Sequence, residues 1–471
     1  MYVRDVYDEL YNRYVSQFRY VIVTGNPGIG KSYFSLYVLY RLRKERRDLV
    51  IVYESVPTSI RVVFNGDTVS IPVNEIEFSP LLEKEDTIYL FDAGTQGAGK
   101  PRLTTSRTIV FSSPSLSNYH DWYKERVYGD AGGGVMVYMP TWSWDEINKL
   151  CIVRKLESEK ARERFNHWGG IARCIFRTVQ KCDTSEYADL NTAISDCIPE
   201  NIIRLANALR GGDVDKNSHM VLHICVTNRL PDGLLDYTSA VIHFASDYVV
   251  DRVFEKYIDS TKNRLIDVVN HCKDSWLSGI HGQLFERFAH FSFMNHDALE
   301  YDTKCLEPAH SMFNKVTKKK FGKLIETPLP NVAALASNRD QKGVYLKPVQ
   351  KNFESLDAII PPKVGVQMTV ASSHPIKTVE LQRVVNALGC TKTRTFTFYF
   401  VVPRDVFDGF KKQSYLDNST QAQKDCSTNG QKDGSRKAKT RKSQKDDSMK
   451  AQKYKFSTDE VVEQWALCID L

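Results

Sequence analysis

Short apolar runs alternate with amphipathic stretches near the start of the chain. The β-branched run Tyr20–Val23 is bounded by glycine, which predicts a buried strand that enters a loop. Residues 1–18 before it predict a short amphipathic helix, and Tyr33–Arg46 after it has helical periodicity and a basic end. A second apolar strand follows at Leu49–Tyr53. This order of strand, glycine loop, helix and strand predicts a parallel α/β sheet whose helices cover its faces.

The same domain continues with a hairpin and further buried strands. Two alternating runs, Ile60–Phe64 and Thr68–Val73, flank Asn65-Gly66, a dipeptide favoured in two-residue turns, so we expect a hairpin on the sheet edge. Two more strands and two helices of a lid are predicted at Thr87–Phe91, Thr108–Ser112, Trp144–Leu150 and Glu157–Phe165.

A second, smaller α/β unit is predicted from Ser275 onward. Its expected elements are a helix through Leu284-Phe285-Glu286, strands at Val344–Leu346, Leu356–Ile360 and Val364–Val370, a helix at Pro375–Leu388 and a strand at Thr395–Val402. The predicted organisation is an N-terminal helix (1–18), a first domain with its lid (19–200), a connector (201–274), a second domain (275–410), a disordered Lys/Gln/Ser-rich segment (411–453) and a C-terminal segment (454–471).

Length and composition limit the class of protein. A chain of 471 residues suits two or three domains, and 42% of its residues are hydrophobic, enough to form their cores. The ten cysteines show no zinc-ligand spacing, so reduced thiols are the simplest interpretation. Neither a secretory signal nor an apolar run of about 18 residues is visible, so no membrane association is expected. The net charge of +7 is compatible with a polyanionic partner but does not identify a function.

A phosphate-binding loop occupies the turn after the first strand. It reads Gly25-Asn26-Pro27-Gly28-Ile29-Gly30-Lys31-Ser32 and matches the P-loop pattern between a buried strand and a helix. Glycines let successive backbone N–H groups point at phosphates, Lys31 neutralises the β- and γ-phosphates, and Ser32 ligates magnesium. We therefore expect ATP and Mg²⁺ to bind at this loop.

Other residues of this nucleotide site are predicted at strand ends and in the lid. Asp92 closes an apolar strand where a carboxylate supports magnesium, although aspartate also commonly begins a turn. Because Ala93 follows it instead of a glutamate, hydrolysis is expected to be slow or to use another base, with Glu54 one candidate. Ser112 and Ser113 are candidates to sense the γ-phosphate, and Arg173 to reach it from the lid; plain turn and surface positions remain the alternatives.

Together these motifs resemble the Crinkler effectors and the related retrotransposon-hot-spot proteins. The resemblance spans most of residues 18–405 and rests on the P-loop, Phe91-Asp92, Ser112-Ser113-Pro114, Pro140–Glu146 and Gly169–Arg173. It implies a P-loop NTPase followed by a restriction-endonuclease-like domain, in a protein that fungi or oomycetes secrete into host cells, where it acts in the nucleus. Members usually carry a delivery header before the NTPase, and none is visible in this sequence.

A nuclease of that type needs a carboxylate at one strand end and an acid-x-lysine on the next strand. Asp357 fits the first position as a metal ligand, but Gln367 and Thr369 stand where the acid and the lysine belong. Glu286 is a candidate second carboxylate, and Lys377 or Lys363 a candidate replacement ammonium. Binding of DNA without cleavage is therefore as good an interpretation as cleavage.

Three functions remain open at this point. One is an effector that uses ATP and acts on DNA; the second is a nucleotide-switched module that has lost cleavage and occupies DNA or a host nuclear protein. A third is an internal signalling ATPase unrelated to hosts. Two basic runs, Lys318–Lys320 with Lys323 and Arg436–Lys442, are candidates for nuclear import or phosphate contact, with a solubilising tail as the alternative for the second. Oligomeric state is left open.

Overall fold

The chain forms two compact units, Met1–Leu284 and Phe285–Leu471, which we describe separately. The structure is a computed structural model. It describes residues 2–72, 75–94, 99–128, 133–177, 187–211, 218–258, 262–272, 274–295, 299–349, 353, 355–416 and 461–470.

The first unit is built on a seven-stranded sheet with the strand order β4-β3-β2-β5-β6-β1-β7. Its strands are β1 Tyr20–Thr24, β2 Val50–Ser55, β3 Ile60–Asn65, β4 Thr68–Ser70, β5 Thr87–Gly94, β6 Arg107–Ser112 and β7 Gly134–Tyr138. The five strands from β2 to β7 in this order are parallel, whereas β3 and β4 form the predicted antiparallel hairpin at the edge. The parallel sheet expected from the sequence is confirmed, and β7 is a strand that the sequence did not predict.

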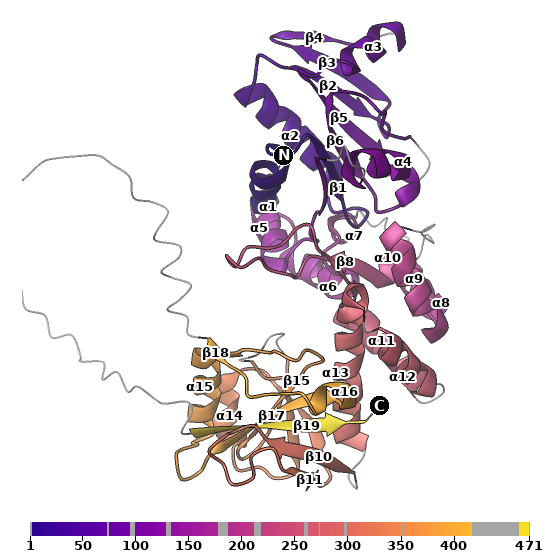
Figure 1. The fold of residues 1–471 in the computed structure, drawn as a ribbon. Coiled ribbons are helices and arrows are strands. Elements are labelled where there is room, and N and C mark those ends of the chain that lie inside the picture. The colour runs from indigo at the N-terminus through magenta and orange to yellow at the C-terminus, as the bar shows by residue number, and fades with distance from the viewer. Residues whose placement is uncertain are drawn as a thin grey trace, which may run out of the picture. The chain divides into compact units, whose positions relative to one another are not determined.

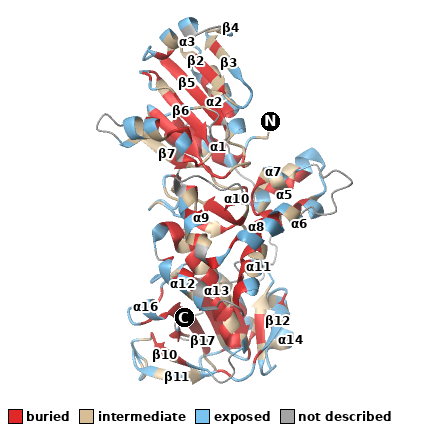
Figure 2. Cartoon of the chain, turned by 90° about the vertical axis from the view of Figure 1, so that its right-hand side faces the viewer, coloured by how far each residue is buried: buried red, intermediate tan, exposed pale blue. Residues whose placement is uncertain are grey.

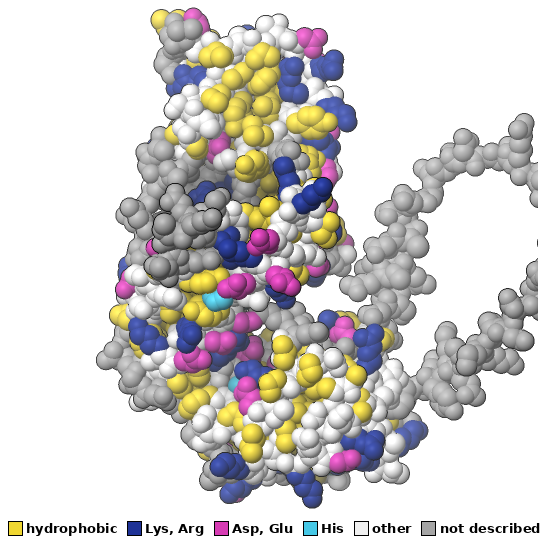
Figure 3. All heavy atoms as spheres, turned by 180° about the vertical axis from the view of Figure 1, so that it is seen from behind, with side chains coloured by type: hydrophobic (Ala, Val, Ile, Leu, Met, Phe, Trp, Pro, Cys, Tyr) yellow, Lys and Arg dark blue, Asp and Glu magenta, His cyan; other side chains and the backbone are white. Residues whose placement is uncertain are grey.

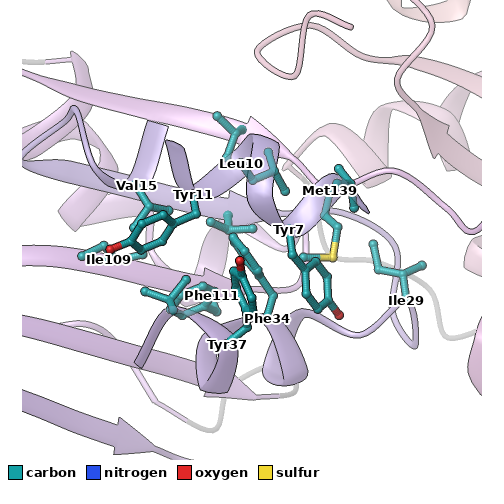
Figure 4. Close-up of a cluster of buried hydrophobic side chains, with 14 of the residues drawn as sticks. Tyr7, Leu10, Tyr11, Val15, Ile29, Phe34, Tyr37, Ile109, Phe111 and Met139 are labelled. Carbon is teal, nitrogen blue, oxygen red and sulfur yellow. The ribbon is translucent and has the colours of Figure 1, made fainter. Parts of the chain in front are cut away.

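Helices cover both faces of this sheet (Figure 1). One face packs against α2, Lys31–Glu45, and against the N-terminal helix, which is α1 Asp5–Leu10 continued by the π-helix η1 Tyr11–Val15. Tyrosine and phenylalanine rings fill the space between these helices and the sheet (Figure 4). The opposite face is covered by α3 Glu75–Leu82 and by α4 His120–Tyr123. Figure 2 shows the central strands as the buried layer between them.

The rest of the first unit is largely helical. Its elements are η2 Leu116–Asn118, η3 Lys124–Tyr128, α5 Trp144–Arg154, α6 Ser158–Trp168, α7 Ala172–Ile175, α8 Ala188–Asp196, α9 Pro199–Gly211, α10 Ser218–Val221, β8 Leu222–Cys225, β9 Val241–Phe244, α11 Asp247–Ile258, α12 Lys262–His271 and η4 Ser275–Leu277. Residues 201–274, interpreted from the sequence as a connector, lie inside this unit. One contact that places them there is the hydrogen bonding of Asn26 in the P-loop to Ile224 in β8. These two residues are too far apart in sequence for a local pattern to predict the contact.

The second unit holds an eight-stranded sheet with the strand order β11-β10-β19-β17-β15-β14-β13-β12. Its strands are β10 Glu300–Cys305, β11 Val316–Lys320, β12 Ile325–Leu329, β13 Val344–Pro348, β14 Ala358–Ile360, β15 Val364–Met368, β17 Phe396–Pro403 and β19 Val462–Ile469. Smaller elements are η5 Val332–Ala334, α14 Leu335–Asn338, β16 Ile376–Lys377, α16 Arg404–Phe407 and β18 Tyr415–Leu416. One face packs on Phe285, Ala289 and Phe293 of α13, Ser278–Asn295, and the other on α15, Thr378–Ala387.

The C-terminal residues supply a central strand of this sheet. β19 pairs in parallel with β17 over eight residues, from Val462 opposite Phe396 to Ile469 opposite Pro403, and antiparallel with β10 on its other side. No strand was predicted from the sequence in the segment 454–471. Of the segment 411–453 that we predicted to be disordered, residues 417–453 lie outside the described residues.

Candidate functional site

The loop between β1 and α2 has a backbone that requires glycine. Gly25, Gly28 and Gly30 have φ values of +137°, +84° and +107°, in the region that L side chains rarely adopt. A Cβ atom at Gly28 would lie 2.9 Å from the Cβ of Arg173, and one at Gly25 would lie 2.7 Å from the carbonyl oxygen of Met139. The glycines of the motif therefore serve both the loop conformation and the close approach of two other segments.

Lys31 folds over this loop as the first residue of α2. Its ammonium donates hydrogen bonds to the carbonyl oxygens of Gly25, at 2.8 Å, and Asn26, at 2.9 Å. Burial lowers the pKa of Lys31 to about 7, and the nearby positive charge of Arg173 acts in the same direction, while Asp92 opposes both. A side chain whose positive charge is disfavoured in the free protein is suited to bind an anion, because an anion would restore the charge.

A cavity of about 1190 Å³ opens in front of this loop. The described residues that line it include most of those predicted from the sequence: Pro27, Gly28, Ile29, Gly30, Lys31, Ser32, Asp92, Ser112, Ser113 and Arg173. Apolar side chains from the N-terminal segment and the lid complete the wall, among them Tyr2, Trp142 and Leu150. The structure thus brings together residues from β5, β6 and α7 at the loop.

Asn26 has a different position from its neighbours in the motif. Its side chain is fully buried, donates to the carbonyl oxygen of Ile224 at 2.8 Å and accepts from the N–H of Ile224 at 2.9 Å. The side chain therefore pairs with β8 as a strand residue would, and it does not line the cavity. Its contribution to the site is to fix the loop.

Glu54, a sequence candidate for activating water, is not in the cavity. It lies on the sheet face shared by Val52 and Tyr89, opposite to the face that packs on α2. Its carboxylate accepts from the hydroxyl of Tyr89 and pairs with Arg61 at 2.7 Å. The interpretation of Glu54 as a general base is therefore wrong, because the pleat of β2 points it away from the loop.

Close contacts at Gly170 hold the lid segments together, and two hydrogen bonds join the lid to the loop. A Cβ atom at Gly170 would lie 2.2 Å from the carbonyl oxygen of Trp142, and the N–H of Trp142 donates to the carbonyl oxygen of Gly170 at 2.9 Å. Trp142 in turn donates through Nε1 to the carbonyl oxygen of Ile29 at 2.7 Å, and the N–H of Arg173 donates to that of Gly28 at 3.2 Å. The lid segments are thus fixed directly to the P-loop backbone.

Arg4 ties the N-terminal segment to the lid. Its guanidinium, almost wholly buried, forms an ion pair with Glu146 at 2.7 Å and donates to the carbonyl oxygens of Pro140 and Thr141, both at 3.1 Å. It also lies over the ring of Trp142, 4.6 Å from the centroid. The sequence did not identify Arg4, since nothing local distinguishes it from a surface arginine.

Replacing Arg4 with methionine is expected to lower the free energy of unfolding of the first unit by about 3 kcal/mol, because Glu146 and two carbonyl groups would lose their partner. Urea unfolding followed by circular dichroism measures this loss. Lys149→Met is the matched control, since Lys149 pairs with Asp5 at 3.8 Å on the surface, where an ion pair contributes about 0.5 kcal/mol or less. Equal losses in the two variants would contradict the role of Arg4.

In the second unit, Asp357 and Gln367 meet at the ends of adjacent strands. One carboxylate oxygen of Asp357 accepts from the N–H of Met368 at 2.6 Å and from Nε2 of Gln367 at 2.8 Å. Burial, and next the negative charge of Glu286 on α13, raise the pKa of Asp357. Glu286 itself pairs with Arg287 at 3.1 Å. The structure therefore brings the predicted acidic pair and its amide into one partly buried cluster, in which the Glu286 side chain is 39% exposed.

The lysines proposed from the sequence are placed differently. Lys377 pairs with Glu380 at 3.3 Å, and Lys363 lies at the opposite end of the β14–β15 hairpin from Asp357. Among the described residues, the hydrogen bonds and main charges that act on Asp357 come from Met368, Gln367, Glu286 and Arg287. The predicted replacement ammonium is thus not found at either position.

The basic run Lys318–Lys320 belongs to an edge strand, β11. Its side chains alternate between the two faces, and Lys318 pairs with Asp302 at 2.5 Å. Charged residues on an edge strand hinder the addition of another strand, which accounts for this run without a nucleic acid. On the face shown in Figure 3, basic and acidic side chains are mixed and do not form one basic surface. The second run, Arg436–Lys442, lies outside the described residues.

Comparison with known proteins identifies relatives but no family model. No model of a protein family matches the chain. Two curated proteins of Phytophthora infestans are similar to it: Crinkler effector protein 16, 26% identical over 396 residues, and Crinkler effector protein 15, 25% identical over 397 residues. Each alignment covers 80% of this chain and 59% of the relative, so the chain spans about three-fifths of the length of these relatives.

Among solved structures, the Holliday junction branch migration motor RuvB of Thermotoga maritima is similar at 10% identity and a TM-score of 0.25, over 46% of this chain and 67% of the motor. A variant of that protein gives a TM-score of 0.23. Within the described part of the chain, none of the helices has both the length and the hydropathy needed to span a membrane.

Proposed function

The chain belongs to the Crinkler family, and from that premise we propose that its first unit binds ATP with magnesium and hydrolyses it. One observation carries the proposal. A glycine loop with three positive φ values, a lysine ammonium, a buried carboxylate and the hydroxyls of four serines (Ser32, Ser112, Ser113 and Ser115) converge on a single cavity. That set of groups matches the chemistry of a triphosphate and its cation.

Each group has a distinct task. The loop N–H groups and Lys31 would hold the phosphates, and Arg173 would approach from the lid, since guanidinium suits phosphate oxygens. Ser32 and Asp92 would hold magnesium, which supplies charge neutralisation when bound. Oxygen ligands of these two kinds are those that Mg²⁺ prefers, so the residues fit the cation.

We expect slow hydrolysis of ATP because the cavity offers few carboxylates. Asp92 is the one carboxylate among the described residues that line it, and Glu54 points to the other face of the sheet. With no second acid to orient water, catalysis would rest on positioning and on donors to the γ-phosphate. Release of phosphate from ATP in magnesium and in EDTA tests the proposal, and equal rates in the two would reject it.

Binding of the nucleotide is expected to take up a proton above neutral pH. With a pKa of about 7, Lys31 is mostly neutral at pH 8.5 in the free protein, and the bound phosphates would raise that pKa. Calorimetry in buffers of different ionisation enthalpy should show uptake approaching one proton at pH 8.5 and little from Lys31 near pH 6. Lys31→Arg is the control, because guanidinium does not titrate there. The same uptake in that variant would contradict the assignment.

For the second unit we propose a restriction-endonuclease-like domain that engages DNA. The acidic cluster of Asp357 and Glu286 supports it, because a carboxylate pair at adjacent elements can hold magnesium. Gln367 uses its amide nitrogen on Asp357, so only its carbonyl oxygen remains for a cation. Among the described residues no group of three His, Cys, Asp or Glu side chains is arranged to hold a metal ion.

These same observations favour the second candidate, a DNA-binding or host-protein-binding module without cleavage. Asp357→Asn in the full chain separates the two, because asparagine can still accept from the N–H of Met368 and keep the fold. Magnesium-dependent cutting of plasmid DNA by the wild type, lost in the variant, would support a nuclease. Retarded migration of uncut DNA by both proteins would support the binding module.

We also propose, from the family alone, that the protein is delivered into host cells and acts in the nucleus. Support comes from the relatives, which are named as effectors of Phytophthora infestans. A fluorescent fusion of the full chain expressed in plant cells tests the destination. Exclusion from the nucleus would favour an internal signalling ATPase over an effector of this kind.

A further inference from the structure

The turn after β6 carries two cavity hydroxyls and one buried amide. Ser112 ends β6, Ser113 follows it, and both line the cavity. The chain then curls through η2, which ends at Asn118. Asn118 is 1% exposed and lies behind the serines, outside the set of residues that line the cavity.

Asn118 donates to both serines at once. Its Nδ2 atom lies 3.2 Å from Oγ of Ser112 and 2.9 Å from Oγ of Ser113. An amide nitrogen can only donate, so each serine oxygen accepts this bond and keeps its own proton for another acceptor. A hydroxyl otherwise rotates to suit any neighbour. The contact therefore selects the direction in which the two hydroxyl protons can point.

We propose that Asn118 is a positioning residue which directs the hydroxyl protons of Ser112 and Ser113 toward the terminal phosphate of the nucleotide. The inference rests on the proposed ATPase function and extends it to a residue that does not touch the nucleotide. Donors fixed in advance cost no reorganisation when negative charge develops on the phosphate oxygens. They matter more here because Asp92 is the one acid among the described lining residues.

The turn has the rigidity that this task needs. The N–H of Asn118 donates to the carbonyl oxygen of Ser115 at 3.2 Å, which fixes its backbone. Tyr119, also buried, donates from its hydroxyl to the carbonyl oxygen of Pro114 at 3.3 Å, so two hydrogen bonds close the turn directly after the serines. A side chain enclosed in this way has few rotamers, so its amide holds one orientation.

Reversing the polarity of residue 118 tests the inference. In Asn118→Asp the carboxylate accepts and cannot donate, so both hydroxyl protons should turn to it and away from the phosphate. In Asn118→Ala the hydroxyls are released but not redirected. Steady-state turnover should fall in the order wild type, Asn118→Ala, Asn118→Asp, with a loss of about 10-fold or more in kcat for the aspartate variant. Affinity for a non-hydrolysable ATP analogue should change less than about 3-fold for the alanine variant.

A double-mutant cycle separates positioning from a general structural role. If Asn118 acts through the two hydroxyls, adding Asn118→Ala to Ser112→Ala/Ser113→Ala should lower kcat by less than about 2-fold further. Ser117→Ala is the matched control in the same turn, since Ser117 is exposed and lies outside the cavity lining. It should keep wild-type turnover. If Asn118→Asp does not fold, the cycle of alanine variants at residues 112, 113 and 118 still tests the inference.

Additive losses in the cycle, or wild-type kcat in Asn118→Asp, would overturn the inference. The second result would mean that the serines donate to residue 118 and not to the phosphate. Failure of the proposed function has a different signature: the wild type would show no turnover, and Lys31→Ala would leave nucleotide binding unchanged.

Discussion

Lys31→Ala is expected to weaken the binding of magnesium and ATP at least about 100-fold and to remove measurable hydrolysis. An ammonium that contacts phosphate oxygens in a partly desolvated site contributes several kcal/mol to binding, which corresponds to a change of that size. The structure supports this expectation because the Lys31 ammonium already lies over the loop, 2.8 Å from the carbonyl oxygen of Gly25. Calorimetric titration with a non-hydrolysable analogue measures the affinity.

The same substitution should not harm the free fold. Burial lowers the pKa of Lys31, so the protein without nucleotide holds this charge at an energetic disadvantage. The melting temperature of the variant without nucleotide should therefore equal or exceed that of the wild type. Lys44→Ala, at an exposed position in the last turn of the same helix, is the control and should bind normally. Unchanged affinity in Lys31→Ala would remove the basis of the proposed function.

Removal of residues 461–471 is expected to abolish the cooperative unfolding transition of the second unit. β19 lies between β17 and β10, so its loss leaves the hydrogen-bonding groups of both neighbours unpaired. Its buried residues Val462, Ala466, Leu467 and Ile469 contribute roughly 7 kcal/mol of apolar burial, similar to the whole stability of a typical domain. Limited proteolysis and calorimetry would show the loss, and retention of the transition would contradict it.

An internal deletion provides the matched control for β19. Removing residues 421–455 takes out only a segment outside the described residues and leaves β18 and β19. Gln413 and Gln464 bond to each other, at 2.8 Å from N–H to Oε1, so the ends Leu416 and Val461 lie at most about 30 Å apart. The nine residues left between them span roughly 33 Å when extended. This variant should therefore keep the unfolding transition that the truncated chain loses.

Several features of the first unit could be predicted from short stretches of sequence. The P-loop is recognisable because the glycines, Lys31 and Ser32 are consecutive and lie between a strand and a helix, so one short stretch holds the whole signal. The hairpin around Asn65-Gly66 was predictable for the same reason. Asp92 and Ser112 could be proposed because the carboxyl ends of parallel strands share one edge of a sheet.

Errors and omissions arose where the answer depended on distant contacts. The face of β2 that carries Glu54 could not be read, because a central strand is apolar on both faces and shows no alternation. Asn118 was missed because a polar residue in a turn has no pattern of its own. The placement of residues 201–274 beside the P-loop depends on the pairing of Asn26 with Ile224, which no local rule could supply.

The sequence by itself determined that a P-loop motif lies between a buried strand and a helix, and that a second α/β unit follows the first. These conclusions rest on patterns within one or two elements, whereas a nuclease role for Asp357 is only what the family resemblance implies. Only the tertiary structure decided that Asp92, Ser112, Ser113 and Arg173 face one cavity, and that residues 462–469 complete the sheet of the second unit. The physical reason is that burial and hydrogen bonding join groups by distance in space, whereas local sequence patterns constrain only near neighbours in the chain.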